Sequence, residues 1–74
     1  MALVRVEYYS GTKANERPVR FELEGHDYMV DEVIEQWYGP DDAFFKVRAE
    51  DGNIYVLRHN AVADVWALES FRKS

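Results

Sequence analysis

Short runs in which apolar and polar residues alternate fill most of this chain, and turn-forming residues separate them. The turn signals are Gly11, Gly25, Gly39-Pro40 and Asp51-Gly52, at nearly even intervals. The runs between them are rich in Val, Ile, Tyr, Phe and Trp, which favour strands. The pattern predicts an antiparallel β domain whose consecutive strands are joined by tight turns.

Two strands are predicted early in the chain, over residues 3–9 and 19–24. In each, every second side chain is apolar, which marks a strand with one buried face. The apolar positions are Val4, Val6 and Tyr8 in the first strand and Val19, Phe21 and Leu23 in the second. The polar segment 10–17 reads as a loop. Pro18 suits the first position of a strand, because its missing N–H costs little there.

Gly25-His26 is predicted to form the turn after the second strand. A type II′ hairpin turn favours glycine at its first central position. The register that follows pairs residues of like burial on the core face and opposite charges on the outer face. Its pairs are Leu23 with Tyr28, Phe21 with Val30, and Arg20 with Asp31.

Residues 28–38 are compatible with two structures. The first is a long strand with a bulge near Asp31-Glu32, which would shift the alternation by one position. The second is a single helical turn, because the apolar residues also fit helical spacing. We favour the strand, since a two-residue hairpin requires an extended chain after the turn, and Gly39-Pro40 then ends it.

The clearest hairpin joins residues 44–48 to residues 53–59 through the segment 49–52. A type I turn followed by Gly52 in the left-handed region, a G1 bulge, matches this connection. The core-face pairs are then Phe45 with Leu57 and Val47 with Tyr55. The outer-face pairs are Lys46 with Val56, Arg48 with Ile54, and Phe44 with Arg58.

A loop over residues 60–64 and a short last strand over residues 65–69 complete the prediction, with a frayed tail from residue 71. The expected fold is all-β, a single domain over residues 1–74. It is a small antiparallel meander that closes as an SH3-like or partly open barrel, because closure leaves few open strand edges. The predicted core consists of Val4, Val6, Tyr8, Val19, Phe21, Leu23, Tyr28, Val30, Ile34, Trp37, Phe45, Val47, Tyr55, Leu57, Trp66 and Leu68.

Composition narrows the classes of protein. The 74 residues are 47% hydrophobic and 15% aromatic, enough for one core. The chain has no Cys, which excludes a disulfide framework and a thiolate zinc site. No signal peptide is visible and no apolar run reaches the ~18–20 residues of a membrane span. We therefore expect a cytoplasmic protein without a membrane partner.

Charge argues against strong nonspecific binding to nucleic acid, because the formal net charge is −5. The distribution is uneven. Residues 22–42 hold eight acidic residues and no Lys or Arg, whereas residues 44–74 hold five basic and four acidic residues. One acidic face and one mildly basic face are one interpretation, and two ordinary solvated surfaces are the other.

No catalytic, metal-binding or phosphate-binding motif stands out. His26 falls in a predicted turn and His59 at a strand end, and neither has a nucleophile beside it in the sequence. Asp41-Asp42 follows Gly39-Pro40 and suits turn chemistry. We therefore predict a protein that is not an enzyme and has no catalytic residue, no metal and no cofactor.

One set of residues has the composition of a binding surface: basic side chains interleaved with an aromatic and two aliphatic ones on one hairpin face. The set comprises Phe44, Lys46, Arg48, Ile54, Val56 and Arg58. Such a face suits a protein or peptide partner, or single-stranded nucleic acid whose bases stack on aromatics. A packing interpretation competes with both, in which Ile54 and Val56 lie under Trp66 or the C-terminal tail and the basic stems extend past them. Arg58 would then pair with an acidic residue of 22–42.

Longer motifs give the chain a resemblance. They are Arg17-Pro18-Val19-Arg20-Phe21-x-Leu23-x-Gly25-x-x-Tyr28-x-Val30, Ile34-x-x-Trp37-Tyr38-Gly39, Phe45-Lys46-Val47-Arg48-Ala49-Glu50-Asp51-Gly52-x-x-Tyr55-x-Leu57-Arg58-His59 and Trp66-x-Leu68. With these residues the chain resembles a bacterial domain family of unknown function, found as short stand-alone cytoplasmic proteins. The resemblance spans residues 17–68 and implies a bacterial source and a β-rich fold. It implies no activity and no functional residue.

The function expected from the sequence is that of a non-enzymatic protein-interaction module. The alternative is weak, salt-sensitive binding of single-stranded nucleic acid through the same hairpin face. A small enzyme or accessory subunit whose site the sequence does not show ranks last. A homodimer formed through an edge strand is a further option.

Overall fold

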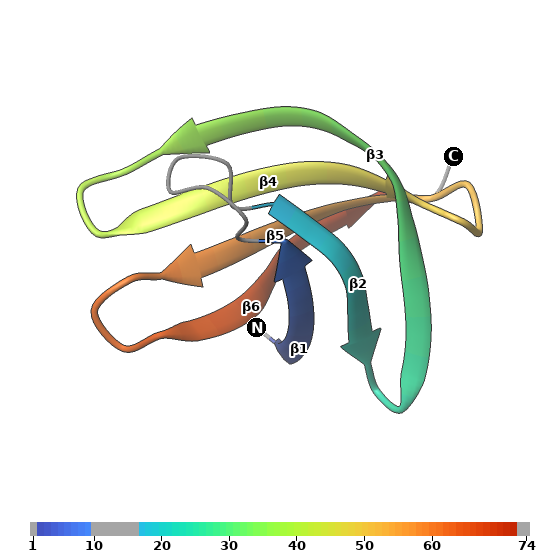
Figure 1. The fold of residues 1–74 in the computed structure, drawn as a ribbon, viewed down its shortest axis with the longest axis horizontal. Helices are drawn as coiled ribbons and strands as arrows, with labels where there is room; N and C mark the ends of the chain where they lie inside the picture. The colour runs from blue at the N-terminus through green and yellow to red at the C-terminus, as the bar shows by residue number, and fades with distance from the viewer. Residues whose placement is uncertain (1, 10–16, 73–74) are drawn as a thin grey trace.

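Six antiparallel strands and no helix make up the described part of the protein. The computed structural model describes residues 2–9 and 17–72. The strands are β1 (Ala2–Tyr9), β2 (Arg17–Leu23), β3 (His26–Tyr38), β4 (Asp42–Ala49), β5 (Ile54–Asn60) and β6 (Val65–Arg72). Each pairs with the next along the chain, and β6 pairs with β1 to close a barrel (Figure 1). The predicted all-β meander is confirmed, and its closure is consistent with an SH3-like barrel.

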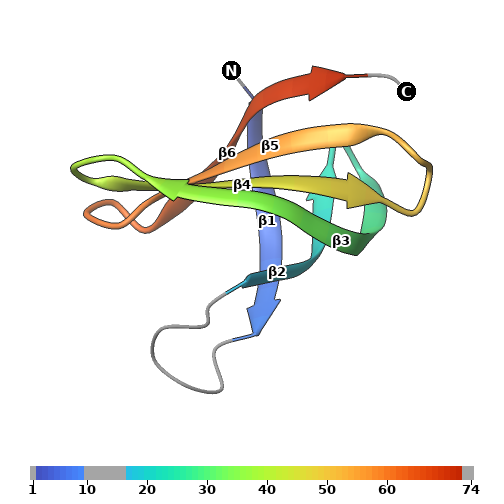
Figure 2. The ribbon, with the colours of Figure 1, turned by 90° about the horizontal axis from the view of Figure 1, so that it is seen from above.

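Two bent strands make this closure possible. Residues 26–29 of β3 pair with β2, whereas residues 30–38 pair with β4. Residues 2–4 of β1 pair with β6, and residues 5–9 pair with β2. Strands β3 to β6 therefore form one curved layer, which β1 crosses at a steep angle (Figure 2). One face of this layer covers the core and the other faces outward.

The bend of β3 coincides with two irregularities in its pairing. The register shifts between Val30 and Glu32, and again between Val33 and Glu35. The first shift confirms the predicted bulge near Asp31-Glu32. The second was not predicted, and the alternative of a helical turn in this segment is wrong, because β3 stays extended to Tyr38.

The turn between β2 and β3 lies one residue earlier than predicted. Its central residues are Glu24 and Gly25, with φ of 52° and 84°, and Leu23 pairs with His26. Positive φ at both central residues matches the right-handed twist of the strands. The predicted pairs are wrong: Phe21 faces Tyr28 rather than Val30, and Arg20 faces Met29 rather than Asp31. This error shifts the register by two positions, so each side chain keeps its face.

The β4–β5 hairpin has the predicted register throughout. All five predicted pairs are present, including Phe45 with Leu57 and Lys46 with Val56. Gly52 has φ of 86°, and its N–H donates to the Ala49 carbonyl oxygen at 2.9 Å. The predicted connection over residues 49–52, with Gly52 in the left-handed region, is therefore confirmed.

The C-terminal strand is longer than expected. Strand β6 runs to Arg72 rather than to residue 69, so the predicted fraying at residues 71 and 72 is wrong. At a register shift, Val56 of β5 pairs with Ser70 and Leu57 pairs with Leu68, so Glu69 is passed over in the pairing with β5. The predicted loop at 60–64 is one residue shorter, because Asn60 ends β5. The predicted loop at 10–17 lies outside the described residues, except Arg17, which starts β2.

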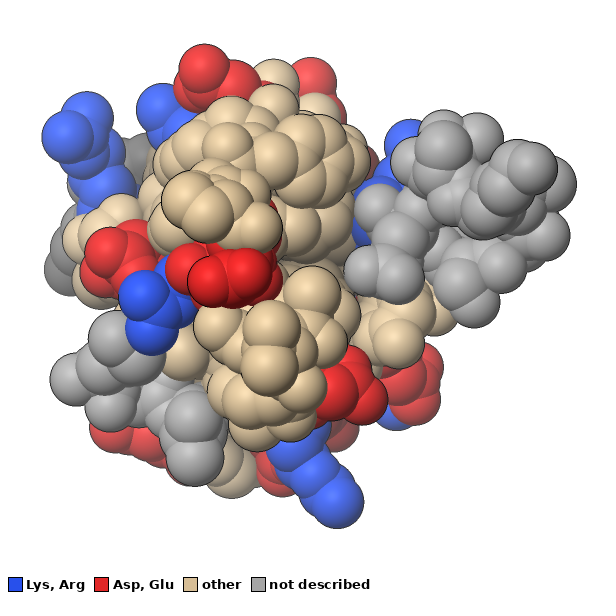
Figure 3. All heavy atoms as spheres, turned by 90° about the vertical axis from the view of Figure 1, so that its left-hand side faces the viewer, with Lys and Arg blue, Asp and Glu red and all other residues tan. Residues whose placement is uncertain are grey.

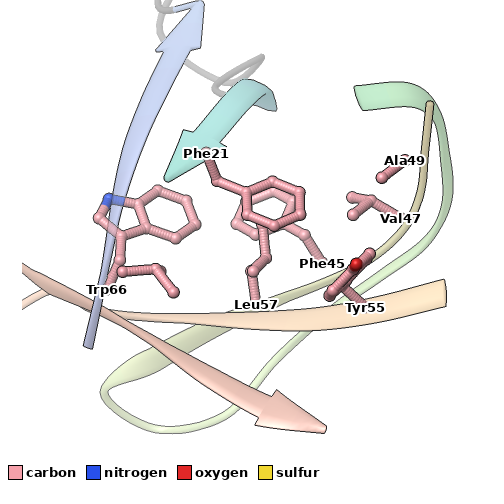
Figure 4. Close-up of a cluster of buried hydrophobic side chains, with 8 residues drawn as sticks. Phe21, Phe45, Val47, Ala49, Tyr55, Leu57 and Trp66 are labelled. Carbon is pink, nitrogen blue, oxygen red and sulfur yellow. The ribbon is translucent and has the colours of Figure 1, made fainter. Parts of the chain in front are cut away.

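The core lies between the inner face of the curved layer and strands β1 and β2 (Figure 4). Predicted core residues that are buried are Val4, Phe21, Phe45, Val47, Tyr55, Leu57 and Trp66. Predicted core residues that are partly buried and packed against them are Val6, Leu23, Tyr28, Val30 and Leu68. Buried residues that were not predicted are Pro18, Ala49, His59 and Ala67.

Four predicted core residues are instead exposed: Tyr8, Val19, Ile34 and Trp37. Ile34 lies at the second register shift of β3, after which Glu35 and Trp37 lie opposite the outward-facing Lys46 and Phe44. Tyr8 and Val19 lie at a register shift between β1 and β2, because Glu7 pairs with Arg20 whereas Tyr8 pairs with Pro18 and Val19 is passed over. Irregular pairing, which the alternation of residue types cannot place, explains these errors.

Candidate interaction surface

The six residues that the sequence singled out share the outer face of β4 and β5. Their neighbours in the ladder, Phe45, Val47, Tyr55 and Leu57, point into the core. Because side chains alternate between the faces of a strand, the intervening residues point outward. The predicted grouping of Phe44, Lys46, Arg48, Ile54, Val56 and Arg58 is thus present, as three facing pairs.

Strands β3 and β6 extend this face on both sides. Trp37 lies opposite Phe44, Glu35 opposite Lys46, and Glu32 opposite Arg48. On the other side, Ser70 lies opposite Val56, and Arg72 opposite Ile54. We call the outer face of β3 to β6 the barrel face.

An open groove of about 450 Å³ crosses the barrel face. Its lining residues are Ile34, Glu35, Trp37, Lys46, Ile54, Val56, Ser70 and Arg72. Three of them, Lys46, Ile54 and Val56, belong to the predicted set. Phe44 lies beside the groove, whereas Arg48 and Arg58 are not among its lining residues. The contribution of β3 and β6 was missed, because it depends on registers that the sequence pattern did not fix.

An aromatic pair forms one edge of the groove. The rings of Trp37 and Phe44 stack with centroids 5.4 Å apart and an interplanar angle of 4°. Trp37 is 39% exposed, so its predicted place in the core is wrong. Trp66, by contrast, is buried as predicted and does not cover Ile54 or Val56, which remain half-buried in the groove.

Charge on the barrel face is partly neutralised by the molecule itself. Arg48 Nη2 lies 2.9 Å from Glu32 Oε1, and Arg58 Nη1 lies 3.7 Å from Glu69 Oε1. Arg58 therefore forms an ion pair with β6. Lys46 and Arg72 differ, since the side chain of neither forms a hydrogen bond or ion pair with any other described residue. The groove is therefore lined by two cations, Lys46 and Arg72, and by one acidic residue, Glu35.

A second region of exposed apolar side chains lies on the β3–β4 and β5–β6 turns. Tyr38 and Val62 are 66% and 81% exposed. The turns are tied together, because Asn60 Nδ2 donates to Asp42 Oδ1 at 2.9 Å. Figure 3 views this end of the molecule and shows uncharged surface interrupted by acidic and basic side chains. The apolar groups here stand on separate turns rather than around a groove in the sheet.

His59 is a buried titratable residue, and its contact with a carboxylate resembles the His–Asp pair of some active sites. Its Nε2 lies 2.9 Å from Asp64 Oδ1, and its ring stacks on Trp66 with centroids 4.6 Å apart. Asp64 has φ of 55° and ends the β5–β6 turn. The pair therefore fastens this turn to the core, since a residue in the left-handed region needs such support.

Tyr55 and Asp51 form a second polar contact beside the core. The Tyr55 hydroxyl donates to Asp51 Oδ2 at 2.7 Å, and the Asn53 N–H donates to Asp51 Oδ1 at 3.0 Å. Burial, and then the hydrogen bond to Asp51, raise the pKa of Tyr55 well above its ordinary value. Burial alone would raise the pKa of Asp51, but the hydrogen bonds from Asn53 and Tyr55 together lower it below its ordinary value.

Within residues 2–9 and 17–72, no group of three or more His, Cys, Asp or Glu side chains is placed to hold a metal ion. The same residues include no helix long and apolar enough to span a bilayer.

The described residues define a small closed antiparallel barrel whose outer face carries an open groove with an aromatic edge. No family model, no curated protein and no solved structure matches this chain. The resemblance to a bacterial domain family therefore stays a prediction.

Proposed function

We propose that this protein is a non-enzymatic interaction module that binds another protein through the barrel face. The observation that carries the proposal is the Trp37–Phe44 stack at the edge of a groove whose floor is Ile54 and Val56. Exposed Trp side chains beside an apolar pocket are typical of the few residues that dominate binding energy at protein interfaces. Stacking on Phe44 also fixes the indole before binding, which reduces the entropy lost on association.

The mode of binding follows from the pairing of the strands. Strands β4 and β5 each pair with a neighbour on both sides, so their backbone hydrogen-bonding groups are used within the barrel. A partner that lies on this face cannot join the sheet as an added strand there. It must therefore be recognised by side chains: the aromatic edge, the aliphatic floor and the cations Lys46 and Arg72.

Single-stranded nucleic acid is the second candidate. The observation in its favour is an exposed indole in the same groove as two cations that form no ion pair with another described residue, since bases stack on aromatics while cations contact phosphates. Three carboxylates on the same face oppose it: Glu32, Glu35 and Glu69. The formal net charge of −5 opposes it as well. All of these negative charges repel a polyanionic strand, whereas a protein partner need place only a few charges, and those within the groove, so a protein partner is the better proposal.

The first test compares partners retained by the immobilised protein from a bacterial lysate. Trp37→Ser and Ile34→Ser alter the groove, while Val62→Ser alters an exposed apolar residue on the β5–β6 turn. We expect retention of a specific partner to fall at least about tenfold in both groove variants and to be unchanged in Val62→Ser. Binding is then repeated with the purified partner, and circular dichroism verifies that each variant is folded.

The second test titrates a mixed-sequence single-stranded oligonucleotide into the ¹⁵N-labelled protein at low salt. The proposal predicts no clustered shifts on the barrel face at millimolar oligonucleotide. Shifts confined to Phe44, Lys46 and Ile54 that vanish at high salt would instead establish the nucleic-acid function. Equal retention of every partner by wild type and groove variants would overturn the proposed use of this face.

A further inference from the structure

We propose that the groove recognises an extended acidic segment of its partner, in which two carboxylates flank one apolar side chain. This inference rests on the proposed function and names the chemistry of the partner. The charges and spacing of the groove carry it.

The first observation concerns Lys46 and Arg72, whose side chains form no ion pair with another residue that the structure describes. Elsewhere on the barrel face the arginines meet glutamates, as Arg48 does with Glu32 and Arg58 with Glu69. Lys46 and Arg72 have no such contact among the described residues, although both line the groove. With Glu35 as the lining carboxylate, the groove keeps one excess positive charge. A partner with carboxylates would pair with the two cations and a basic partner would be repelled.

The spacing argument uses the register of the sheet. Lys46 faces Val56, which faces Ser70, so the row from β4 to β6 covers two strand spacings, about 10 Å. Arg72 lies two residues beyond Ser70, which adds about 7 Å along the strand. The two cations therefore stand about 12 Å apart across the sheet, with the Ile54 and Val56 side chains between them.

An extended segment matches this distance. At about 3.3 Å per residue, carboxylates four positions apart are separated by about 13 Å. Alternate residues of an extended chain point to the same side. Positions i and i+4 would then reach the cations, while the apolar side chain at i+2 would contact the aliphatic floor. The expected pattern is acidic–x–apolar–x–acidic.

The chain itself contains such a pattern in Asp27, Met29 and Asp31 of β3, where Met29 is 50% exposed. A second copy is therefore a competing occupant. We favour a separate partner because Asp27 and Met29 belong to a strand already paired with β2, opposite Glu22 and Arg20. Sedimentation over a range of concentrations distinguishes the two occupants.

The test uses three synthetic peptides flanked by Gly-Ser, titrated into the ¹⁵N-labelled full chain. The first contains Asp-Thr-Leu-Thr-Asp, the second Lys-Thr-Leu-Thr-Lys, and the third Asp-Asp-Leu-Thr-Thr, which has the same composition as the first. We expect shifts on groove residues with the first peptide and an affinity at least about tenfold above that of the second. The third peptide should bind about threefold more weakly than the first, because it cannot reach both cations.

Matched charge reversals separate the groove from net charge. Lys46→Glu should lower the affinity for the acidic peptide about fivefold or more. Arg5→Glu makes the same change of net charge and should alter this affinity by less than about twofold. Arg5 is a suitable control because it lies on β1 opposite Glu22, outside the barrel face. In the double variant Lys46→Glu/Arg72→Glu, the preference should invert in favour of the lysine peptide.

Equal affinity for the first two peptides, or no binding of the acidic peptide at millimolar concentration, overturns the proposal that the partner segment is acidic. Wild-type self-association that is lost in Lys46→Glu overturns it in favour of a second copy. The proposed function fails separately: it is contradicted when Trp37→Ser and Ile34→Ser retain every partner. A partner that depends on Trp37 but tolerates both charge reversals leaves the interaction module standing and rejects this inference alone.

Discussion

Asp51 organises the β4–β5 turn through a single carboxylate. One oxygen accepts from the Asn53 N–H, and the other accepts from the Tyr55 hydroxyl and from Asn53 Nδ2. Tyr55 is 3% exposed, so the contact connects a solvent-facing turn to the core. A charged acceptor with several donors is stabilised only while it stays ionised.

Replacing Asp51 with Asn should make the free energy of unfolding depend less on pH in the acidic range. The folded-state pKa of Asp51 lies below its ordinary value of 3.8. Its contribution is therefore fully present above that value and is lost as the pH falls through the folded-state pKa. Because the carboxyl is exposed, we expect Asp51→Asn to lower the free energy of unfolding at pH 7 by only about 1 kcal/mol. In urea titrations, this difference should shrink as the pH falls below about 4.

Asp31→Asn is the control for this pH dependence. The Asp31 side chain is exposed and makes no hydrogen bond with other described residues. Its replacement should change the free energy of unfolding by less than about 0.5 kcal/mol at either pH. A stability gap for Asp51→Asn that is independent of pH would contradict the role assigned to the carboxylate.

At the scale of elements, the β2–β3 turn carries a correctable strain. Glu24 has φ of 52°, and a side chain in this region costs about 1 kcal/mol relative to the right-handed conformation. Asn tolerates it better, and Asn-Gly is the preferred pair for such turns. We expect Glu24→Asn to raise the free energy of unfolding by about 0.5 kcal/mol. Gly25→Ala should lower it by about 1 kcal/mol, because φ is 84° there.

Thermal denaturation of these variants also decides where the turn lies. With the turn at Glu24-Gly25, His26 is the first residue of β3 and gains nothing from becoming Asn. If His26→Asn stabilised the protein while Glu24→Asn did not, the turn would be one residue later, at the place that the sequence pattern indicated.

The two hairpins show why one register was predictable and the other was not. In β4–β5, a plain two-residue turn at Asp51-Gly52 would have placed Phe45 opposite Arg58, so the mismatch in polarity excluded it. In β2–β3, the competing registers differ by two positions and keep every side chain on its face, so alternation could not separate them. Only the conformational preference of Glu24 and Gly25 distinguishes these registers.

The sequence predicted groove residues only on strands whose pairing register it also predicted. Lys46, Ile54 and Val56 come from the hairpin with an unambiguous turn, and their shared face followed directly. Trp37 and Arg72 come from strands with bulges, and each bulge reverses which side chains face outward. An extra residue in a strand leaves no signature in composition, so the aromatic edge and the second cation required the structure.

At the scale of the whole molecule, the β1–β6 seam is the shortest part of the barrel. Among the described residues, three pairs join β1 to β6, namely Ala2 with Leu68, Leu3 with Ala67, and Val4 with Trp66. The β4–β5 ladder has seven. Since each paired residue adds hydrogen bonds and packing, local opening should begin at this seam.

Native-state hydrogen exchange measures this difference directly. We expect the protected amides of residues 2–4, which pair with β6 and not with β2, to exchange about 100-fold faster than those of Phe45, Val47 and Leu57, which require global unfolding. Urea should accelerate the core amides strongly and those of the seam weakly, because local opening exposes little surface. Equal exchange rates in both regions would show that the barrel opens only as a unit.

The β1–β6 seam also joins residues that lie much farther apart in the sequence than the paired residues of the other ladders. Neighbouring strands meet across short connections, whereas Val4 and Trp66 are separated by most of the chain. The entropy of bringing such distant segments together delays their contact until the rest of the sheet exists. Val4→Ala should therefore accelerate unfolding more than it slows refolding in stopped-flow experiments. The lifetime of the closed barrel, rather than the speed of its assembly, would then be set where the first strand meets the last.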